Sequence, residues 1–342
     1  MSGVARRVRR VALVVLTGAA LAGLLTVTAA AAAPLAAPDR AVAADRTDVY
    51  IKDVAADLGY QPHTLSPLWA SPDIKVCPTA IECAVSQNPI VGQTNYVFVK
   101  LRNPGPYGSG TSTGVLRVYR TTPGGGAVWP THWTQIGAVN VTAYAGVTTV
   151  TIPWTGVPGP GHFCLIARWV SPTDPMTFEG PDISTNTRNN NNIAWRNVDS
   201  VQLTAGSGQT TVRPFAIGNS LTVPSRNDLV FEAAEPLQAI GGRVVVDLGQ
   251  DLFERWRAGG AVGTGVRAVG RTQIEIVEPT KASLGNLLLN PGERVEFKLL
   301  FSAEAASEKE IAFNVIQFGP DTAGAKRTDL GGVQYLISAD KR

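Results

Sequence analysis

Side chains that commonly catalyse reactions or bind metals are scarce in this sequence of 342 residues. It has three histidines, His63, His132 and His162, and none lies in the H-E-x-x-H spacing of the common zinc-protease helix. No G-x-S-x-G nucleophile elbow and no P-loop occurs. The stretch "GTGVRA" (263–268) matches a dinucleotide fingerprint by its letters, but that fingerprint needs a strand before it and a helix after it, and the predicted order here is the reverse. We therefore predict no catalytic residues and no cofactor.

Three cysteines offer a second kind of chemistry. Cys77 and Cys83 are close enough in sequence to close a small loop by a disulfide in an oxidising compartment. Cys164, in "HFCLIARW", is then expected to pack as a small apolar residue. Zinc is the alternative for the three thiols, but no C-x-x-C spacing and no nearby histidine supports it. We predict the Cys77–Cys83 disulfide and no metal.

Four consecutive asparagines, Asn189, Asn190, Asn191 and Asn192, come directly before an apolar strand that begins at Ile193. Asparagine tolerates positive φ and its side chain can bond nearby backbone, so the run predicts a structural turn that feeds an edge strand. A calcium site is the alternative. It would need several carboxylates, and only Asp174, Glu179 and Asp182 are near in sequence.

Aromatic residues are candidates for ligand contact. The segment "WPTHW" places His132 between Trp129 and Trp133 in a turn region rich in proline and glycine. Six of the seven tryptophans lie between residues 69 and 195, and this pair is the one we expect to be exposed. Flat indole rings can stack on sugar rings. Trp129, Trp133 and His132 are thus the candidate ligand contacts, with a histidine bonded only to backbone as the alternative for His132.

The N-terminus has the pattern of an export signal. Four arginines within the first ten residues precede 23 uncharged residues (11–33), and small residues crowd the end of that stretch. We expect a signal peptide at 1–33, with a retained membrane anchor as the alternative. Residues 1–44 hold five arginines and one aspartate, so the remainder has 25 basic and 26 acidic residues. A basic surface for nucleic acid is therefore not predicted.

The rest of the chain alternates apolar and polar residues in short segments separated by Gly, Pro and Asn, which predicts strands. We expect an all-β fold of two immunoglobulin-like β-sandwiches in tandem, with one short helix at 250–258 in the second. Phe163, Leu165, Ala167 and Trp169 should share one strand face, and the residues between them the other. The expected segments are a disordered linker at 34–47, a first sandwich at 48–203 with an N-terminal extension, a linker at 204–210 and a second sandwich at 211–340.

The first unit resembles the CARDB-type domain, an immunoglobulin-like sandwich named for cell adhesion in bacteria. The resemblance covers about residues 73–203 and is carried by "SPDIKV", "PIVGQTNYVFVKLRNPGPYGSG", "GVTTVTIPW", "PGHFCLIARWV" and "NNNNIAWRNV". The family usually approaches its paired asparagines through an acidic "ES-x-E-x-NN" stretch, whereas this chain has "DISTNTRNNNN". These motifs mark a fold rather than a reaction, and the second half has no assigned family.

Three functional hypotheses follow. The first is a secreted, extracellular, non-catalytic adhesion or assembly module at or near the bacterial cell surface, with a protein or glycan partner. The second is a carbohydrate-binding module, which requires an exposed aromatic platform near Trp129 and Trp133. The third is a secreted hydrolase with an unrecognised site, which requires a pocket holding His132 or His162 beside a carboxylate. We predict the first.

Overall fold

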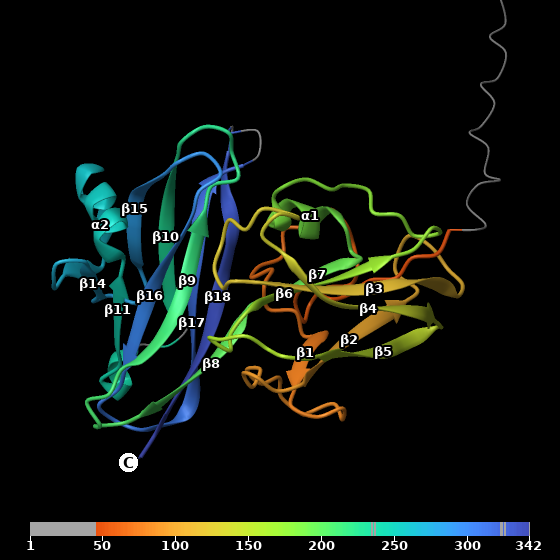
Figure 1. Cartoon of the computed structure of the whole chain (residues 1–342), viewed down its shortest axis with the longest axis horizontal. Helices are drawn as coiled ribbons and strands as arrows, with labels where there is room; N and C mark the ends of the chain where they lie inside the picture. Colours follow the sequence, from red (N-terminus) through yellow and green to blue (C-terminus); the bar gives the residue numbers. More distant parts are fainter. Residues whose placement is uncertain (1–45, 234, 236, 322–323, 325, 342) are drawn as a thin grey trace, which may run out of the picture. The chain divides into compact units, whose positions relative to one another are not determined.

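The computed structural model describes residues 46–233, 235, 237–321, 324 and 326–341 (Figure 1). The expected signal peptide, and all but the last two residues of the expected linker at 34–47, lie outside the described residues. Residues 42–342 group by their contacts into one compact unit. Within the described part, no helix is long and apolar enough to cross a membrane.

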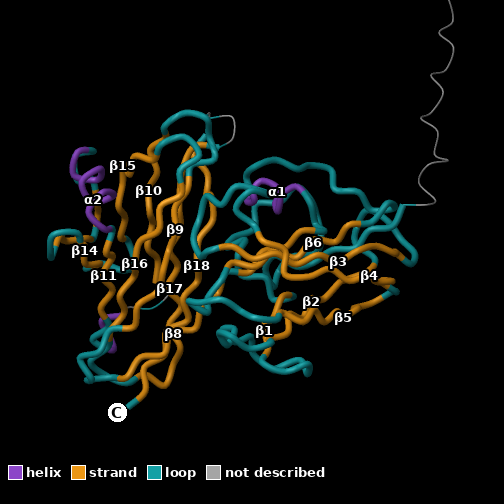
Figure 2. The backbone as a smooth tube through the Cα atoms, viewed as in Figure 1, coloured by secondary structure: helices purple, strands orange, loops and turns teal. Residues whose placement is uncertain are grey.

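Strands dominate the fold, and helices are few and short (Figure 2). The first sandwich has a three-stranded sheet, ordered β1-β2-β5, and a four-stranded sheet, ordered β4-β3-β6-β7. The division of seven antiparallel strands into three and four is that of an immunoglobulin-like sandwich. Its strands are β1 (Ile74–Cys77), β2 (Asn95–Asn103), β3 (Ser112–Thr121), β4 (Thr134–Ala143), β5 (Gly146–Trp154), β6 (Cys164–Val170) and β7 (Ile193–Arg196).

Period-two patterning places the two faces of β6 as the sequence predicts. Phe163, Leu165, Ala167 and Trp169 all belong to the core between the two sheets. Cys164 and Ile166 point to the opposite face, where they are also fully buried, in a separate apolar cluster. A sheet with both faces buried must be covered by something besides its own partner sheet.

The second sandwich pairs a six-stranded sheet, ordered β12-β15-β10-β17-β18-β8, with a five-stranded sheet, ordered β13-β14-β11-β16-β9. Most successive strands cross from one sheet to the other, which gives the connectivity of a jelly roll whose last strand is doubled into a hairpin. Its strands are β8 (Val198–Thr204), β9 (Thr211–Gly218), β10 (Ser225–Ala233), β11 (Arg243–Asp247), β12 (Gly263–Thr264), β13 (Val266–Ala268), β14 (Gln273–Ile276), β15 (Ala282–Leu289), β16 (Arg294–Ser302), β17 (Ser307–Pro320) and β18 (Arg327–Asp340).

Strand β8 belongs by its pairing to the second sandwich. It runs parallel to β18, from Val198 opposite Gln334 to Thr204 opposite Asp340. From sequence, 198–203 is the end of the first sandwich, but its backbone hydrogen bonds are made with the last strand of the chain. Because β8 and β18 are far apart in sequence, no local sequence pattern predicts that they pair.

The predicted helix is present as α2 (Gly249–Ala258), which buries Leu252, Phe253 and Trp256 and ends at Gly259. A 3-10 helix also occurs at Leu237–Ile240. A further short helix that the sequence did not predict, α1 (Ile183–Asn189), forms in the first sandwich. The Asp182 carboxylate caps it by accepting the amides of Ser184 (2.8 Å) and Thr185 (3.2 Å).

The outer face of β6 and β7 packs against the second sandwich. Trp195 of β7 lies in one apolar cluster with Trp69 and with Ile316 of β17. A Cβ at Gly331 of β18, where φ is +115°, would lie 2.2 Å from the Trp195 ring. That close approach requires glycine.

Polar contacts reinforce this junction. The Asn197 amide donates to the Gly332 carbonyl at 2.6 Å. Arg188 Nη2 donates to both carboxylate oxygens of Asp329, at 2.8 and 2.7 Å. The backbone of Gly124 also bridges to that of Ala216 in β9. Apolar packing and buried polar bonds therefore join the two sandwiches.

Replacing Trp195 with alanine should lower the free energy of unfolding by about 3–5 kcal/mol, since truncating a fully buried tryptophan leaves a cavity. Urea unfolding of residues 42–342, followed by circular dichroism, measures the change. Tyr144→Ala is the control, because Tyr144 is 64% exposed and its loss should change the free energy by no more than about 0.5 kcal/mol. A loss below about 1 kcal/mol for Trp195→Ala would contradict the conclusion that this ring stabilises the junction of the two sandwiches.

Candidate functional site

The segment that carries Trp129 and Trp133 connects β3 to β4 and folds inward. Trp133 is only 8% exposed and packs edge-on to Trp195, with ring centroids 6.5 Å apart. Trp129 is half-buried, 5.0 Å from the Tyr119 ring, and the Arg168 guanidinium lies over its face at 4.4 Å. The two tryptophans therefore do not form a shared exposed platform of the kind that sugar stacking needs.

His132 bonds to backbone. Its Nδ1 accepts the Val128 amide at 3.0 Å, and its own amide donates to the Val128 carbonyl at 2.9 Å. Burial, and then the nearby Arg294 guanidinium, lower the pKa of His132. A neutral imidazole that closes a turn explains this position without a ligand.

The asparagine run ties several loops together. Asn189 ends α1, and Asn190 caps it while its side-chain oxygen accepts the amides of Thr177 (2.7 Å) and Phe178 (3.1 Å). The Asn191 amide donates to Asp48 (2.9 Å), and that of Asn192 to the Asp174 carbonyl (3.2 Å). The contacts are structural, but Asn189 lies in α1 rather than in the predicted turn, and none of the four asparagines has a positive φ. The described residues contain no group of three or more His, Cys, Asp or Glu arranged to hold a metal.

The cysteines lie as their spacing suggests. Cys77 and Cys83 are joined as a disulfide across the loop that follows β1, with Cα atoms 5.7 Å apart. Cys164 is a buried free thiol whose pKa burial raises to about 12. A thiol so far from ionisation is a poor nucleophile.

Two buried histidine–carboxylate pairs are present, and the sequence did not reveal either as a pair. His63 Nε2 lies 2.9 Å from Asp53, whose pKa burial raises to about 7 although the His63 contact opposes that rise. His162 Nδ1 lies 3.7 Å from Asp199, and burial lowers the pKa of His162. Only structure brings these residues together, since no motif spans them.

The hollow beside His162 is too small for a substrate. The hollow at His162 has a volume of about 10 Å³, about enough for one water molecule. Ligand pockets usually have volumes of about 300–1,000 Å³. His162 and Asp199 thus lack the substrate-sized cavity that the hydrolase hypothesis requires.

A larger hollow of about 410 Å³ lies beside Arg168. Arg117 and Arg168 face each other across β3 and β6, and Arg168 also pairs with Glu179. The lining includes Asp174, so two guanidinium groups meet two carboxyl groups there. Glu179 neutralises Arg168 within this lining, and burial raises the pKa of the Asp174 carboxyl to about 7.

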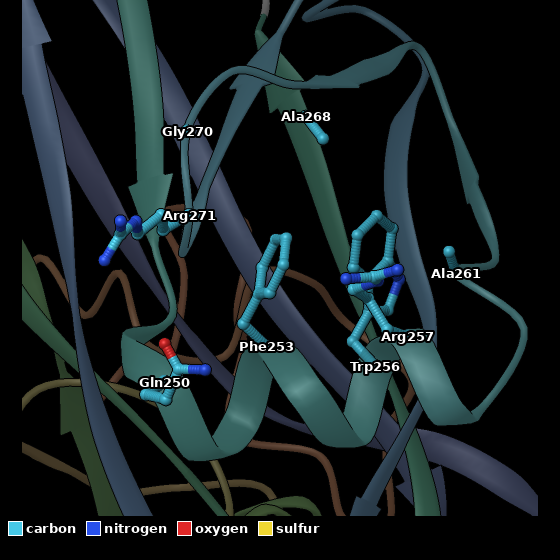
Figure 3. Close-up of a pocket in the computed structure, with 8 residues that line it drawn as sticks. All are labelled: Gln250, Phe253, Trp256, Arg257, Ala261, Ala268, Gly270 and Arg271. Carbon is cyan, nitrogen blue, oxygen red and sulfur yellow. The ribbon is translucent and has the colours of Figure 1, made fainter.

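A hollow of about 550 Å³ lies on the second sandwich, between α2 and the turn that joins β13 to β14 (Figure 3). Phe253 and Trp256 rise from α2, their ring centroids 5.6 Å apart, and in Figure 3 Phe253 stands between Arg271 and Arg257. The Trp256 indole donates to the Val262 carbonyl at 2.8 Å, which fixes that wall.

Charge distinguishes this second hollow from the one at Arg168. Arg257 and Arg271 line it, and within the described part of the chain neither guanidinium group has an ion-pair or hydrogen-bond partner. Arg255, by contrast, is tied to Asp251 and Glu293. The hollow therefore presents two free guanidinium groups and no lining carboxylate, so we take it as the candidate binding site.

Comparison with known proteins gives no family. No family model and no curated protein matches the chain. The CARDB resemblance therefore stays a prediction.

Among solved structures, the CupB6 tip adhesin from Pseudomonas aeruginosa aligns at 10% identity over 79% of this chain and 98% of its own, with a TM-score of 0.22. The collagen adhesin of S. aureus aligns at 11% over 78% and 92%, also at 0.22. E. coli alpha-2-macroglobulin aligns at 12% over 73% and 16%, again at 0.22. Scores this low do not establish a shared fold, so the strand pairing alone defines the architecture.

Asp174 gives a test of the buried charges. Burial raises the pKa of this carboxyl to about 7. Between pH 4 and about 7 the folded chain therefore keeps a proton that the unfolded chain has released, and stability falls as pH rises, by at most about 1.4 kcal/mol per pH unit for this group. Asp174→Asn should make the loss less steep in urea unfolding at pH 5 and pH 7.

The slope, rather than the absolute stability, is the readout, because the substitution also alters the hydrogen bond from the Val49 amide (2.9 Å). Glu308→Gln, at an exposed position, is the control and should keep the wild-type slope. Equal slopes for Asp174→Asn and the wild type would show that this carboxyl is ionised throughout the range.

Proposed function

We propose that this chain is an exported, non-catalytic tandem β-sandwich protein that acts by binding a partner at or near the bacterial cell surface, in adhesion or assembly. The observation that carries the proposal is the hollow on the second sandwich, with its apolar wall and two unpaired arginines. The N-terminal arginines and uncharged stretch support export.

The two alternatives have weaker support. Carbohydrate binding at Trp129 and Trp133 needs exposed ring faces, and Trp133 is buried. Hydrolysis needs a nucleophile or activated water beside an acid–base pair in a substrate-sized cavity. The two buried histidine–carboxylate pairs hold together the segments that carry them, and both histidines are nearly enclosed by protein.

The proposal predicts saturable binding without turnover. Fluorescently labelled protein of residues 42–342, which form one compact unit, should bind intact bacterial cells in a saturable way that unlabelled protein competes. A thermally denatured sample of the same protein is the control for nonspecific adsorption. Retention equal to that of the denatured sample would contradict the binding proposal.

The same preparation should show no turnover on peptide and glycoside substrates. Should turnover be found, His63→Ala and His162→Ala would show whether either buried pair is responsible. Activity that one of these substitutions removes would replace the binding proposal with the hydrolase hypothesis.

A further inference from the structure

We propose that the groove between α2 and β13 binds an extended acidic peptide segment of a partner protein, which pairs with β13 as an added strand. This inference rests on the proposed binding function and names the class of ligand for the hollow of Figure 3. Adding a strand to an exposed sheet edge is a recurrent way of recognising peptides, in which main-chain bonds give affinity and side-chain pockets give specificity.

The edge of β13 is available for such pairing. β13 is the terminal strand of the five-stranded sheet and pairs only with β14. Val269 donates to the Gln273 carbonyl, and Val277 donates to that of Gly265. Antiparallel pairs alternate between bonded and non-bonded, so the amide and carbonyl of Ala268, one residue from Val269, point away from β14.

Ala268 is exposed and lines the hollow, and its outward backbone groups have no partner among the residues described. Unpaired edge groups of this kind are templates for another strand. Helix α2 forms the opposite wall, so an added strand would lie between β13 and the helix. The volume of about 550 Å³ is within the usual range for ligand sites.

Side chains around the groove favour an acidic peptide. Arg257 and Arg271 are both exposed and unpaired in the described structure, and each could form a charge-assisted hydrogen bond to an Asp or Glu carboxylate. Phe253 and Trp256, which also line the groove, suit an apolar side chain on the peptide face that points inward.

An acidic glycan fits this groove less well than a peptide. Phe253 and Trp256 are only 6% and 5% exposed, so they leave too little ring surface for a sugar to stack on. A glycan would also leave the edge amide of Ala268 without the regular main-chain partner that an added strand provides. The free backbone edge thus decides between the two classes.

The test begins with a phage-displayed library of random dodecapeptides, selected on immobilised protein of residues 42–342. We expect the selected sequences to contain Asp or Glu alternating with apolar residues. A synthetic, fluorescein-labelled copy of the most enriched peptide then gives affinities by fluorescence anisotropy. Arg257→Glu and Arg271→Glu should each weaken binding at least tenfold, and added salt should weaken binding to the wild type.

Ala268→Pro tests the backbone contact. Proline removes the outward amide while leaving the bonds of Arg267 and Val269 to β14, a position where a sheet edge tolerates it. We expect at least a tenfold loss of peptide affinity with an unchanged unfolding midpoint. Arg226→Glu is the matched control, since Arg226 is exposed on β10 and outside the groove, and it should change affinity less than twofold.

Three outcomes would overturn the proposal: no peptide selected above background, peptide binding unaffected by all three groove substitutions, or arginine-dependent binding of a labelled oligogalacturonate in place of peptides. The last would assign the groove to an acidic glycan. If one of these three outcomes is found but Arg257→Glu and Arg271→Glu still bind cells, the peptide proposal fails and the proposed binding function stands.

If the wild type does not bind cells, the proposed function fails, and with it the inference that rests on it.

Discussion

The burial of the outer face of β6 and β7 is the constraint on which the rest of the structure depends. A four-stranded sheet with one apolar face needs one partner sheet, but Cys164, Ile166 and Trp195 make the second face apolar as well. Water contact with these side chains is avoided because loops of the first sandwich and strands of the second cover them. The two sandwiches therefore form one compact unit. If they folded as separate units, this face would be exposed to water.

That constraint also accounts for the polar residues that look chemically interesting in the sequence. Loops that cover a sheet face bring backbone groups out of water, and each such group needs a partner. Asn190 and Asn192 supply partners to backbone groups of residues 174–178, and Asn191 supplies one to the Gly59 carbonyl. His132 does the same within its own turn. Bonds to buried backbone thus account for these side chains without a ligand.

Sequence reasoning succeeded where the signal was local and apolar. Alternation assigned both faces of β6, and the spacing of Leu252, Phe253 and Trp256 located α2, because burial on one side repeats at the period of the element. It failed for α1, because all seven residues of this helix except Ile183 are polar. A cap and tertiary hydrogen bonds hold the helix, rather than an apolar stripe. The parallel pairing of β8 with β18 and the meeting of Asp53 with His63 depend on chain segments that only the fold brings together.

The candidate groove arises where the second sandwich departs from regular strands. Between β11 and β15 the chain makes α2, the short strands β12 and β13, and β14, so a helix and a sheet edge lie near each other. Burial of Phe253 and Trp256 fixes the helix, and the ion pairs of Arg255 with Asp251 and Glu293 secure its outer side. Arg257, two residues later on the same helix, takes no part in that network. Arg255 is thus neutralised by two carboxylates, whereas Arg257 has no carboxylate partner. The positive charge of Arg257 lies at the groove, where a carboxylate of a partner can reach it.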